Sequence, residues 1–330
     1  MIDLYKTMAR IRAFELAAEV ASQGGVQVFG AKLDDRAKVR GPLHLSIGQE
    51  AVAAGVCAHL DRQDLLTSTH RGHGHTLAKG GDMRRMMAEL FGRADGSNGG
   101  KGGSMHIADF SIGMLGANGV VTAGLPIACG AAQALKLQGR PQVVACFFGD
   151  GAINRGPFLE ALNWAAVYCL PVLFVCEDNR YSATTSTSRF TAGPGVVARA
   201  ASLGVPGESV DGNDIDAVHQ AAGRMVAQVR AGQGPQLLHA LTWRVRGHVS
   251  VDQQGYRAPQ DLSDAVEADP LRRARELALA RGATAAQMDA VDDEVQAEIE
   301  AAVAFANASP TPDPAHAFTD IQTTGAGTWH

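Results

Sequence analysis

The sequence lacks the features that mark secreted and membrane-spanning proteins. None of its five cysteines stands in a CxxC spacing, and four of them lie in apolar stretches. We therefore expect buried, reduced thiols in a reducing compartment, with a single reactive cysteine as the alternative. The longest apolar run, Trp164–Cys176, contains Pro171 and is shorter than the ~20 residues that a membrane-spanning helix needs. The cysteines are Cys57, Cys129, Cys146, Cys169 and Cys176.

The chain also lacks a strong excess of charge of one sign. The chain has 34 acidic and 29 basic residues, a net charge of −5, and no block of like charges. This balance argues against a nucleic-acid groove and against binding to an anionic membrane surface. The N-terminal segment reads as an amphipathic helix with basic residues on its polar face, and not as a signal peptide. We expect a soluble, cytoplasmic protein.

Glycine, by contrast, is abundant, with 38 among 330 residues against a usual ~7%. Apolar residues make up 46% of the chain, enough for a sizeable core. Strand-like and helical segments alternate, which predicts a mostly parallel sheet with helices on both faces, a doubly wound α/β fold. The expected strands are 64–69, 142–150, 171–176 and 236–243; the expected helices are 82–91, 123–137, 158–167 and one from Asn213 or Asp214 to about Arg230. A long glycine-rich loop is expected over Arg93–Asn118.

The C-terminal part of the chain has a different character. Asp269-Pro270 predicts the start of a helix that Gly282 ends, and Thr284 with Gln287 predicts a capping box for a second helix to about Asn307. These helices carry no cluster of chemical groups. We therefore divide the chain into an α/β domain over 1–265 and a helical and extended subunit-contact region over 266–330.

Polar and glycine-rich peptides follow the predicted strands. In an open parallel sheet, ligands bind beyond the carboxyl ends of the strands, so these peptides are expected to meet at one edge. They are His70–His75 (HRGHGH), Gly149–Gly156 (GDGAINRG), Glu177–Tyr181 (EDNRY) and Arg244–His248 (RVRGH).

The GDG segment combines groups that suit a metal and a phosphate. Gly149 and Gly151 remove side chains, so that backbone N–H groups can approach a phosphate. Asp150 adds a carboxylate, and Asn179 adds an amide oxygen after the next strand. These ligands suffice for Mg²⁺ when a bound molecule adds phosphate oxygens. Taken alone, GDG is more simply an ordinary turn between a strand and a helix.

The sequence argues against a P-loop, a nicotinamide-binding motif and a transition-metal site. GGKGGS (99–104) is no phosphate-binding P-loop, because Gly102 follows Lys101 and Asp95 stands where that motif needs glycine. No GxGxxG follows an early strand, which disfavours a nicotinamide cofactor. His70, His73 and His75 could be exposed loop residues, contacts to an anion or cofactor, or ligands of a transition metal, the last disfavoured by the charge of Arg71.

Taken together, the motifs resemble the alpha subunits of thiamine-diphosphate-dependent 2-oxo acid and acetoin dehydrogenase complexes. The resemblance is carried by GDGAINRGPFLEALNWAAVYCLPVLFVCEDNRY and covers most of the chain. It extends to HLSIGQEA (44–51), STHRGHGH (68–75), GKGGSMHIAD (100–109), LGANGVV (115–121), VDGND (210–214) and WRVRGHVSVDQQGYR (243–257). It implies a thiamine-diphosphate-binding fold and Mg²⁺.

The resemblance also implies roles for individual residues. Mg²⁺ would be bound by Asp150, the Asn179 side chain and the Tyr181 carbonyl. His248 would face the reacting carbon, and His106 is a second candidate catalytic residue, with a plain loop contact as the equal alternative. The remaining cofactor-binding residues would be His70, Arg71, Gly119, Val121, Gly149, Gly151 and Ala152. The diphosphate would be held by Arg71, Gly151, Ala152 and His248. The aminopyrimidine would meet Gly119 and Val121.

The chain departs from the family pattern at three positions. His70 stands where tyrosine is frequent, and Asp178 precedes the metal-binding Asn179 where asparagine is frequent. Val249 replaces the serine that is phosphorylated in regulated mitochondrial relatives, so that control should be absent at this position.

Thiamine chemistry also needs a carboxylate beside the aminopyrimidine. Glu50 and Glu177 are the nearest acids in the motifs, and neither is expected in a pocket. In the family a separate beta chain supplies this glutamate, so we expect an alpha subunit that is active only with a beta subunit, as a heterotetramer of two alpha and two beta chains.

The substrate is the least determined feature. STHRGHGH, GKGGSMHIAD and Arg246 favour the acetoin branch of the family. Such an enzyme cleaves acetoin and passes the acetyl unit to a lipoyl acyltransferase. The alternatives are an alpha subunit acting on pyruvate or another 2-oxo acid, and a non-catalytic cofactor-binding scaffold subunit.

Overall fold

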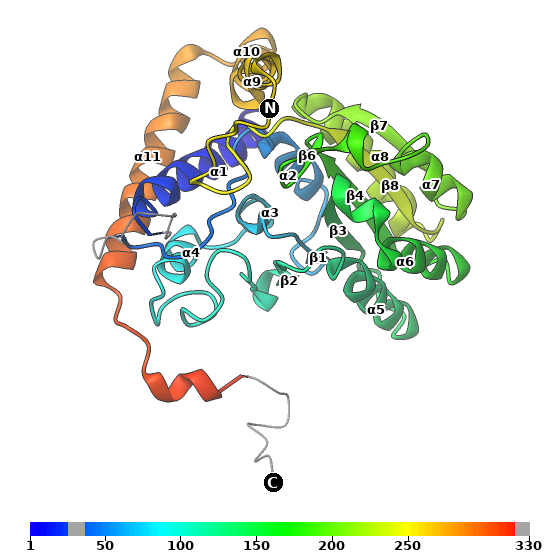
Figure 1. Cartoon of the computed structure of the whole chain (residues 1–330), viewed down its shortest axis with the longest axis horizontal. Helices are drawn as coiled ribbons and strands as arrows, with labels where there is room; N and C mark the ends of the chain where they lie inside the picture. Colours follow the sequence, from blue (N-terminus) through cyan, green and yellow to red (C-terminus); the bar gives the residue numbers. More distant parts are fainter. Residues whose placement is uncertain (26–36, 321–330) are drawn as a thin grey trace.

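A six-stranded parallel sheet forms the centre of the computed structural model, which describes residues 1–25 and 37–320 (Figure 1). Its strand order is β2-β1-β3-β4-β8-β7. The strands are β1 (Leu65–Thr67), β2 (Met114–Gly116), β3 (Val144–Gly149), β4 (Val172–Asp178), β7 (Gly207–Asp211) and β8 (Gln236–Leu241); β5 (Tyr181–Ser182) and β6 (Thr185–Ser186) form a separate antiparallel pair. The doubly wound α/β fold is confirmed.

Helices cover both faces of this sheet because its central strands are apolar on both sides. Along β4, Phe174 faces one core and Leu173 and Val175 face the other. The first core includes α5 (Gly124–Leu137), α6 (Gly156–Val167) and α7 (Val196–Ser202), and the second includes α2 (Glu50–Cys57) and α8 (Ile215–Arg230). Side chains that alternate along a strand therefore fill two separate cores.

Capping residues set several helix boundaries, as predicted at Asp214, Asp269 and Thr284 and also at Asp82, where no cap was predicted. Asp82 caps α4 (Met83–Leu90), and Asp214 caps α8. Asp269 caps α10 (Pro270–Ala280), and Thr284 with Gln287 forms the capping box of α11 (Ala285–Ala308). In each case a side-chain oxygen accepts a hydrogen bond from a backbone N–H of the first turn.

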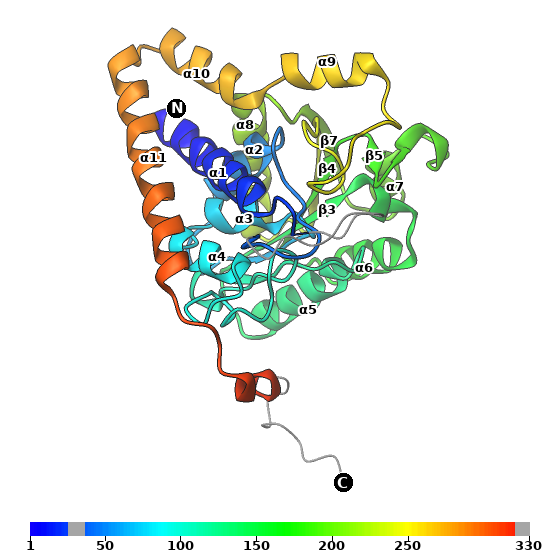
Figure 2. The ribbon, with the colours of Figure 1, turned by 60° about the vertical axis from the view of Figure 1, so that its left-hand side comes forward.

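The C-terminal helices pack against the N-terminal part of the chain. The long α11 lies beside α1 (Ile2–Ala21) and α4 (Figure 2). Lys6 and Arg10 of α1 form ion pairs with Glu294 and Glu298 of α11. The division into regions 1–265 and 266–330 stays a prediction.

Some elements were not predicted. The histidine-rich segment is not only a turn, because helix α3 (Gly72–Ala78) begins within it. The loop 93–118 contains β2, which pairs with β1, and a 3₁₀ turn at Phe110–Ile112. Strand β7, helices α2, α7 and α9 (Pro259–Glu267), and a 3₁₀ turn at Pro314–Phe318 were also missed. Strands of three residues and short helices contain too few residues for a periodic pattern of apolar side chains to be recognised.

Cys57, Cys129, Cys146 and Cys176 are buried, as expected, but Cys169 is exposed although it lies within the apolar run Trp164–Cys176, so the expectation of a buried thiol is wrong there. Burial raises the pKa of Cys57, Cys129 and Cys146 to about 12, so these thiols are weak nucleophiles. None of the helices in the described residues is long and apolar enough to span a bilayer.

Truncation of a central core side chain should destabilise the fold. Phe174 is fully buried on β4, so Phe174→Ala should lower the free energy of unfolding by about 3–5 kcal/mol. Phe110, which is 75% exposed, provides the matched control Phe110→Ala, with little change expected. Denaturant-induced unfolding followed by circular dichroism measures both, and equal losses would contradict the assignment of the core.

Candidate functional site

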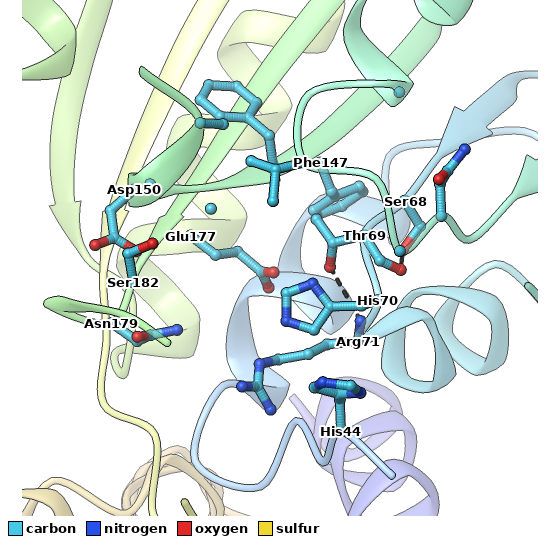
Figure 3. Close-up of a pocket in the computed structure, with 18 of the residues that line it drawn as sticks. His44, Ser68, Thr69, His70, Arg71, Phe147, Asp150, Glu177, Asn179 and Ser182 are labelled. Carbon is cyan, nitrogen blue, oxygen red and sulfur yellow. Dashed lines mark hydrogen bonds between the residues drawn. The ribbon is translucent and has the colours of Figure 1, made fainter. Parts of the chain in front are cut away.

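A cavity opens at the carboxyl ends of β1, β3, β4 and β8 (Figure 3). The chain reverses its direction across the sheet between β1 and β3, the place where doubly wound sheets bind ligands. All the predicted site residues except His106 line this cavity: His70, Arg71, Gly119, Val121, Gly149, Asp150, Gly151, Ala152, Asn179, Tyr181 and His248. The structure brings these residues together, and their individual roles stay predictions.

Asp150 and Asn179 lie on one side of the cavity. The Asp150 carboxylate is buried and accepts a hydrogen bond from Thr187 Oγ1 at 2.5 Å. Burial raises the pKa of Asp150 to about 6, and the nearby Asp178 adds to the effect. Asn179 donates to Gln49 Oε1 at 3.0 Å, while its own Oδ1 accepts from the Tyr181 amide at 3.3 Å. A buried carboxylate beside an amide oxygen is a donor set that suits a hard divalent cation.

Local backbone geometry brings these groups together. Arg180 adopts φ +67°, which turns the chain back immediately after β4 so that Tyr181 returns to the cavity. A Cβ atom on Gly151 would lie 2.4 Å from Ser182 Oγ, so this close approach requires glycine.

Two buried guanidinium groups also border the cavity. Arg71 and Arg244 are 4% and 2% exposed. Arg71 donates to the carbonyls of Leu45 and His248 at 2.7 and 3.0 Å, and Arg244 donates to Tyr256 Oη at 2.7 Å. Within residues 1–25 and 37–320, neither guanidinium forms an ion pair with a carboxylate. Burial, and for Arg71 the nearby Arg244, lowers the pKa of both groups. An anion in the cavity would compensate this buried charge.

Three imidazoles gather beside Arg71. The ring centroids of His44 and His70 are 4.6 Å apart, and those of His44 and His248 are 4.9 Å apart. Burial, with Arg71 as the next cause, lowers the pKa of His44 to about 3, of His70 to about 2 and of His248 to about 4. Their ring nitrogens lie within 4.8 Å of one another. Arg71 Nη2 is 3.3 Å from His248 Nδ1, which disfavours a cation at this cluster.

The sequence had suggested a different histidine group, which the structure separates. His73 and His75 are buried on α3 and do not line the cavity, unlike His70. His73 Nδ1 lies 2.9 Å from Glu15, and His75 Nε2 lies 3.2 Å from Glu177. The interpretations of these two residues as exposed loop residues or as metal ligands with His70 are therefore wrong. His44 was missed as a site residue, although it opens the HLSIGQEA segment.

His106 is exposed, and its Nδ1 lies 3.2 Å from the Gly102 carbonyl oxygen. The preceding residue, Met105, does line the cavity. A Cβ atom on Gly119 would lie 3.8 Å from His106 Nε2, so His106 stands near the rim. Its catalytic role stays a prediction.

Glu177 corrects an expectation from the sequence. Its carboxylate lies in the cavity between Asp150 and His70 (Figure 3), so the expectation that no motif acid stands in a pocket is wrong for Glu177. Glu50 is buried elsewhere, where it pairs with Arg12. The place of Glu177 in the cavity was not expected, because a strand-end acid has no sequence feature that distinguishes a cavity from a core position.

The glycine-rich loop is organised by a protein carboxylate and not by a phosphate. Glu89 of α4 is buried and accepts hydrogen bonds from four backbone amides at 2.7–3.0 Å: those of Asn98, Gly100, Gly102 and Gly103. This arrangement explains the GGKGGS segment without a P-loop, and it fixes the loop that carries Met105 and His106.

Comparison with known proteins decides the family. Residues 30–315 match the family described as the dehydrogenase E1 component. The chain belongs to the dehydrogenase E1 component family. It is 45% identical to the alpha subunit of acetoin:2,6-dichlorophenolindophenol oxidoreductase of Cupriavidus necator over 97% of this chain and 93% of that one, and 43% identical to the Bacillus subtilis protein of the same name over 96% and 92%. It is also 38% identical to the pyruvate dehydrogenase E1 component subunit alpha of Rhizobium meliloti over 97% and 89%.

Membership of the E1 family confirms the resemblance found in the motifs and makes the chain a component of a thiamine-diphosphate-dependent oxidoreductase. The cavity fits such a cofactor. It brings the buried Asp150 carboxylate and two buried guanidinium groups to one cavity, and a diphosphate would supply an anionic partner for guanidinium groups that pair with no carboxylate among the described residues.

The cavity histidines of this E1 component should stay neutral at physiological pH. We expect the ring-proton NMR shifts of His248 to titrate only near pH 4, because burial and Arg71 disfavour the charged form. The folded chain then binds fewer protons than the unfolded chain between about pH 6.5 and 4, so this group lowers stability as the pH falls through that window. The spectrum of His248→Gln assigns the signal, and titration near pH 6.5 would contradict the burial argument.

Proposed function

We propose that this chain is the alpha subunit of a thiamine-diphosphate- and Mg²⁺-dependent acetoin dehydrogenase. The observation that carries the proposal is the presence, in one cavity, of the buried Asp150 carboxylate and of the buried Arg71 guanidinium, which forms no ion pair with a carboxylate among the described residues. Similarity to two acetoin:2,6-dichlorophenolindophenol oxidoreductase alpha subunits supports the reaction class.

The residues divide between a metal and an organic cofactor. Asp150, the Asn179 side chain and the Tyr181 carbonyl would hold Mg²⁺, while the Arg71 guanidinium, the Gly151 and Ala152 amides and His248 would hold the diphosphate. His70 and Gly149 lie beside these groups, and Gly119 and Val121 would meet the aminopyrimidine. When bound, thiamine diphosphate supplies a carbanion that attacks a carbonyl carbon.

Acetoin is favoured over a 2-oxo acid by the charges around the cavity. If the diphosphate occupies the guanidinium groups and a metal occupies the Asp150 site, the other charged or basic side chains that line the cavity in the described residues are the neutral imidazoles and the Glu177 carboxylate. An uncharged hydroxyketone needs no cationic partner, whereas the carboxylate of pyruvate would need one. Arg246 does not supply it, because Arg246 pairs with Glu19 outside the cavity. The pyruvate dehydrogenase relatives keep a 2-oxo acid as the second candidate.

A beta subunit is expected to cover an apolar surface of α5 and α6, which we name the α5–α6 patch. On α5, Ile127 and Leu137 are exposed, and on α6, Trp164 is 51% exposed. Val121, which precedes α5 in the chain, is exposed and also lines the cavity. Its members are Val120, Val121, Ile127, Leu137, Leu159, Trp164, Val167 and Tyr168. Several exposed apolar side chains on two packed helices are typical of a protein interface.

A partner bound at the α5–α6 patch would reach the rim of the cavity. This position agrees with an active site that the two chains complete together, in a heterotetramer of two alpha and two beta chains. A lipoyl acyltransferase would then take up the acetyl unit. The cytoplasmic location remains part of the proposal.

Removal of the Asp150 charge should abolish metal-dependent cofactor binding. We expect Asp150→Asn to weaken thiamine diphosphate binding in the presence of Mg²⁺ by about a hundredfold or more, because it removes the carboxylate from the proposed metal site. Asp178→Asn is the matched control, since Asp178 lies at the end of the same sheet but pairs with His239. Isothermal titration calorimetry measures both, and unchanged affinity in Asp150→Asn would refute the metal assignment.

Disruption of the α5–α6 patch should separate the subunits. Trp164→Arg places a charge in the patch, so we expect loss of co-purification with the beta subunit and loss of acetoin-dependent reduction of 2,6-dichlorophenolindophenol. Val266→Arg, at an equally exposed residue of α9, should change neither.

The same dye assay separates the alternatives. The alpha chain alone should be inactive, and full activity without a partner would refute a shared site. Faster turnover of pyruvate than of acetoin would favour a 2-oxo acid as the substrate. If a correctly assembled, cofactor-loaded complex is inactive with both substrates, the chain is better described as a non-catalytic scaffold subunit.

A further inference from the structure

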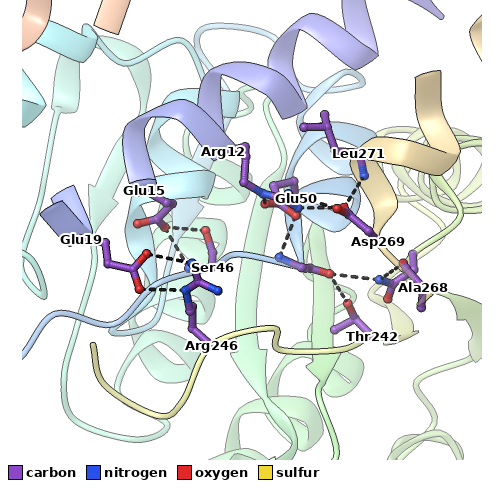
Figure 4. A network of polar contacts seen from close by, with 12 residues as sticks. Arg12, Glu15, Glu19, Ser46, Glu50, Thr242, Arg246, Ala268, Asp269 and Leu271 are labelled. Carbon is purple, nitrogen blue, oxygen red and sulfur yellow. Dashed lines mark hydrogen bonds and ion pairs between the residues drawn. The ribbon is translucent and has the colours of Figure 1, made fainter. Parts of the chain in front are cut away.

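One face of α1 carries three charged side chains about one helical turn apart: Arg12, Glu15 and Glu19. All three point toward segments that surround the cavity, although α1 itself contributes no lining residue (Figure 4). A fully exposed helix face would need no such partners, and these polar contacts are mostly buried.

Glu15 is the centre of this network. Its carboxylate is fully buried, and Oε1 accepts hydrogen bonds from Ser46 N at 2.9 Å and Ser46 Oγ at 2.6 Å. Oε2 lies 2.9 Å from His73 Nδ1, and His73 Nε2 lies 3.0 Å from Ser104 Oγ. Burial alone would raise the pKa of Glu15, but His73 and Ser46 lower it, so the carboxylate is ionised.

The two partners of Glu15, and Ser104 as the second partner of His73, belong to three segments that line the cavity. Ser46 lies two residues from His44, and His73 lies two residues from Arg71. Ser104 directly precedes Met105. The Glu15 carboxylate therefore links two parts of the cavity wall directly and a third through His73.

The two neighbouring charges act on further parts of the wall. Glu19 forms two hydrogen bonds with Arg246, at 2.8 and 3.1 Å, two residues before His248. Arg12 binds Glu50, whose other oxygen accepts from Gly48 N at 2.9 Å, next to the cavity residue Gln49.

We propose that α1 positions the cofactor cavity through the Arg12–Glu50, Glu15–His73–Ser104 and Glu19–Arg246 contacts, with Glu15 as the principal positioning residue. This inference rests on the proposed cofactor function. Misplacement of groups that hold a ligand weakens binding even when the fold survives, so the network should control affinity for thiamine diphosphate and not only thermal stability.

Calorimetric titration of thiamine diphosphate into the assembled enzyme with Mg²⁺ provides the test. We expect Glu15→Gln, which keeps the shape of the side chain and removes its charge, to weaken binding about tenfold or more at temperatures well below its Tm. Asp3→Asn makes the same change of charge at an exposed position of α1 and should bind as the wild type does. A Glu15→Gln enzyme with a lowered Tm and an unchanged dissociation constant would overturn the proposal, because the role of Glu15 would then be structural only.

A second set of variants avoids the buried position. Glu19 and Arg246 are partly exposed, so Glu19→Arg and Arg246→Glu should fold. Each should weaken cofactor binding severalfold, and the double variant, which restores an ion pair in reverse, should recover most of the loss. Absence of both the loss and the recovery would overturn the proposal. Failure of the wild-type enzyme to bind the cofactor would instead overturn the proposed function, and this inference with it.

Discussion

Burial of unlike charges on opposite sides of one cavity is the constraint on which the site depends. Asp150 follows β3, and Arg71 follows β1, the neighbouring strand. Because parallel strands end at the same edge, the sheet holds these two groups near each other without a direct ion pair. Each buried charge is costly alone, and an anionic cofactor with a divalent cation would neutralise both.

Because a buried charge without partners is costly, the two buried carboxylates beside the cavity wall are surrounded by hydrogen-bond donors from that wall. Glu89 binds four amides of the glycine-rich loop, and Glu15 binds Ser46 and His73. Both carboxylates are buried and fully engaged with donors, so they add rigidity without placing further negative charge in the cavity. The geometry of the cavity wall therefore depends in part on residues that do not line the cavity.

The HRGHGH segment shows how neighbouring residues acquire different tasks. His70 and Arg71 precede α3 and face the cavity, whereas His73 and His75 lie within α3 and bind acids on other elements. Helical geometry turns successive side chains in different directions, so sequence proximity does not make these histidines one site. The imidazoles that do meet, His44, His70 and His248, come from three distant segments.

The sequence by itself determined the fold class, the longer helices with their caps, and the place of the site at the strand ends. These features depend on local periodicity, on capping side chains such as Asp214 and Thr284, and on motifs around Asp150 and Asn179 that are contiguous along the chain. Only the tertiary structure decided which charges find partners. Folding brings distant segments together, and this places Glu177 in the cavity and forms the contacts from α1. Burial of the three imidazoles in the folded chain then keeps them neutral.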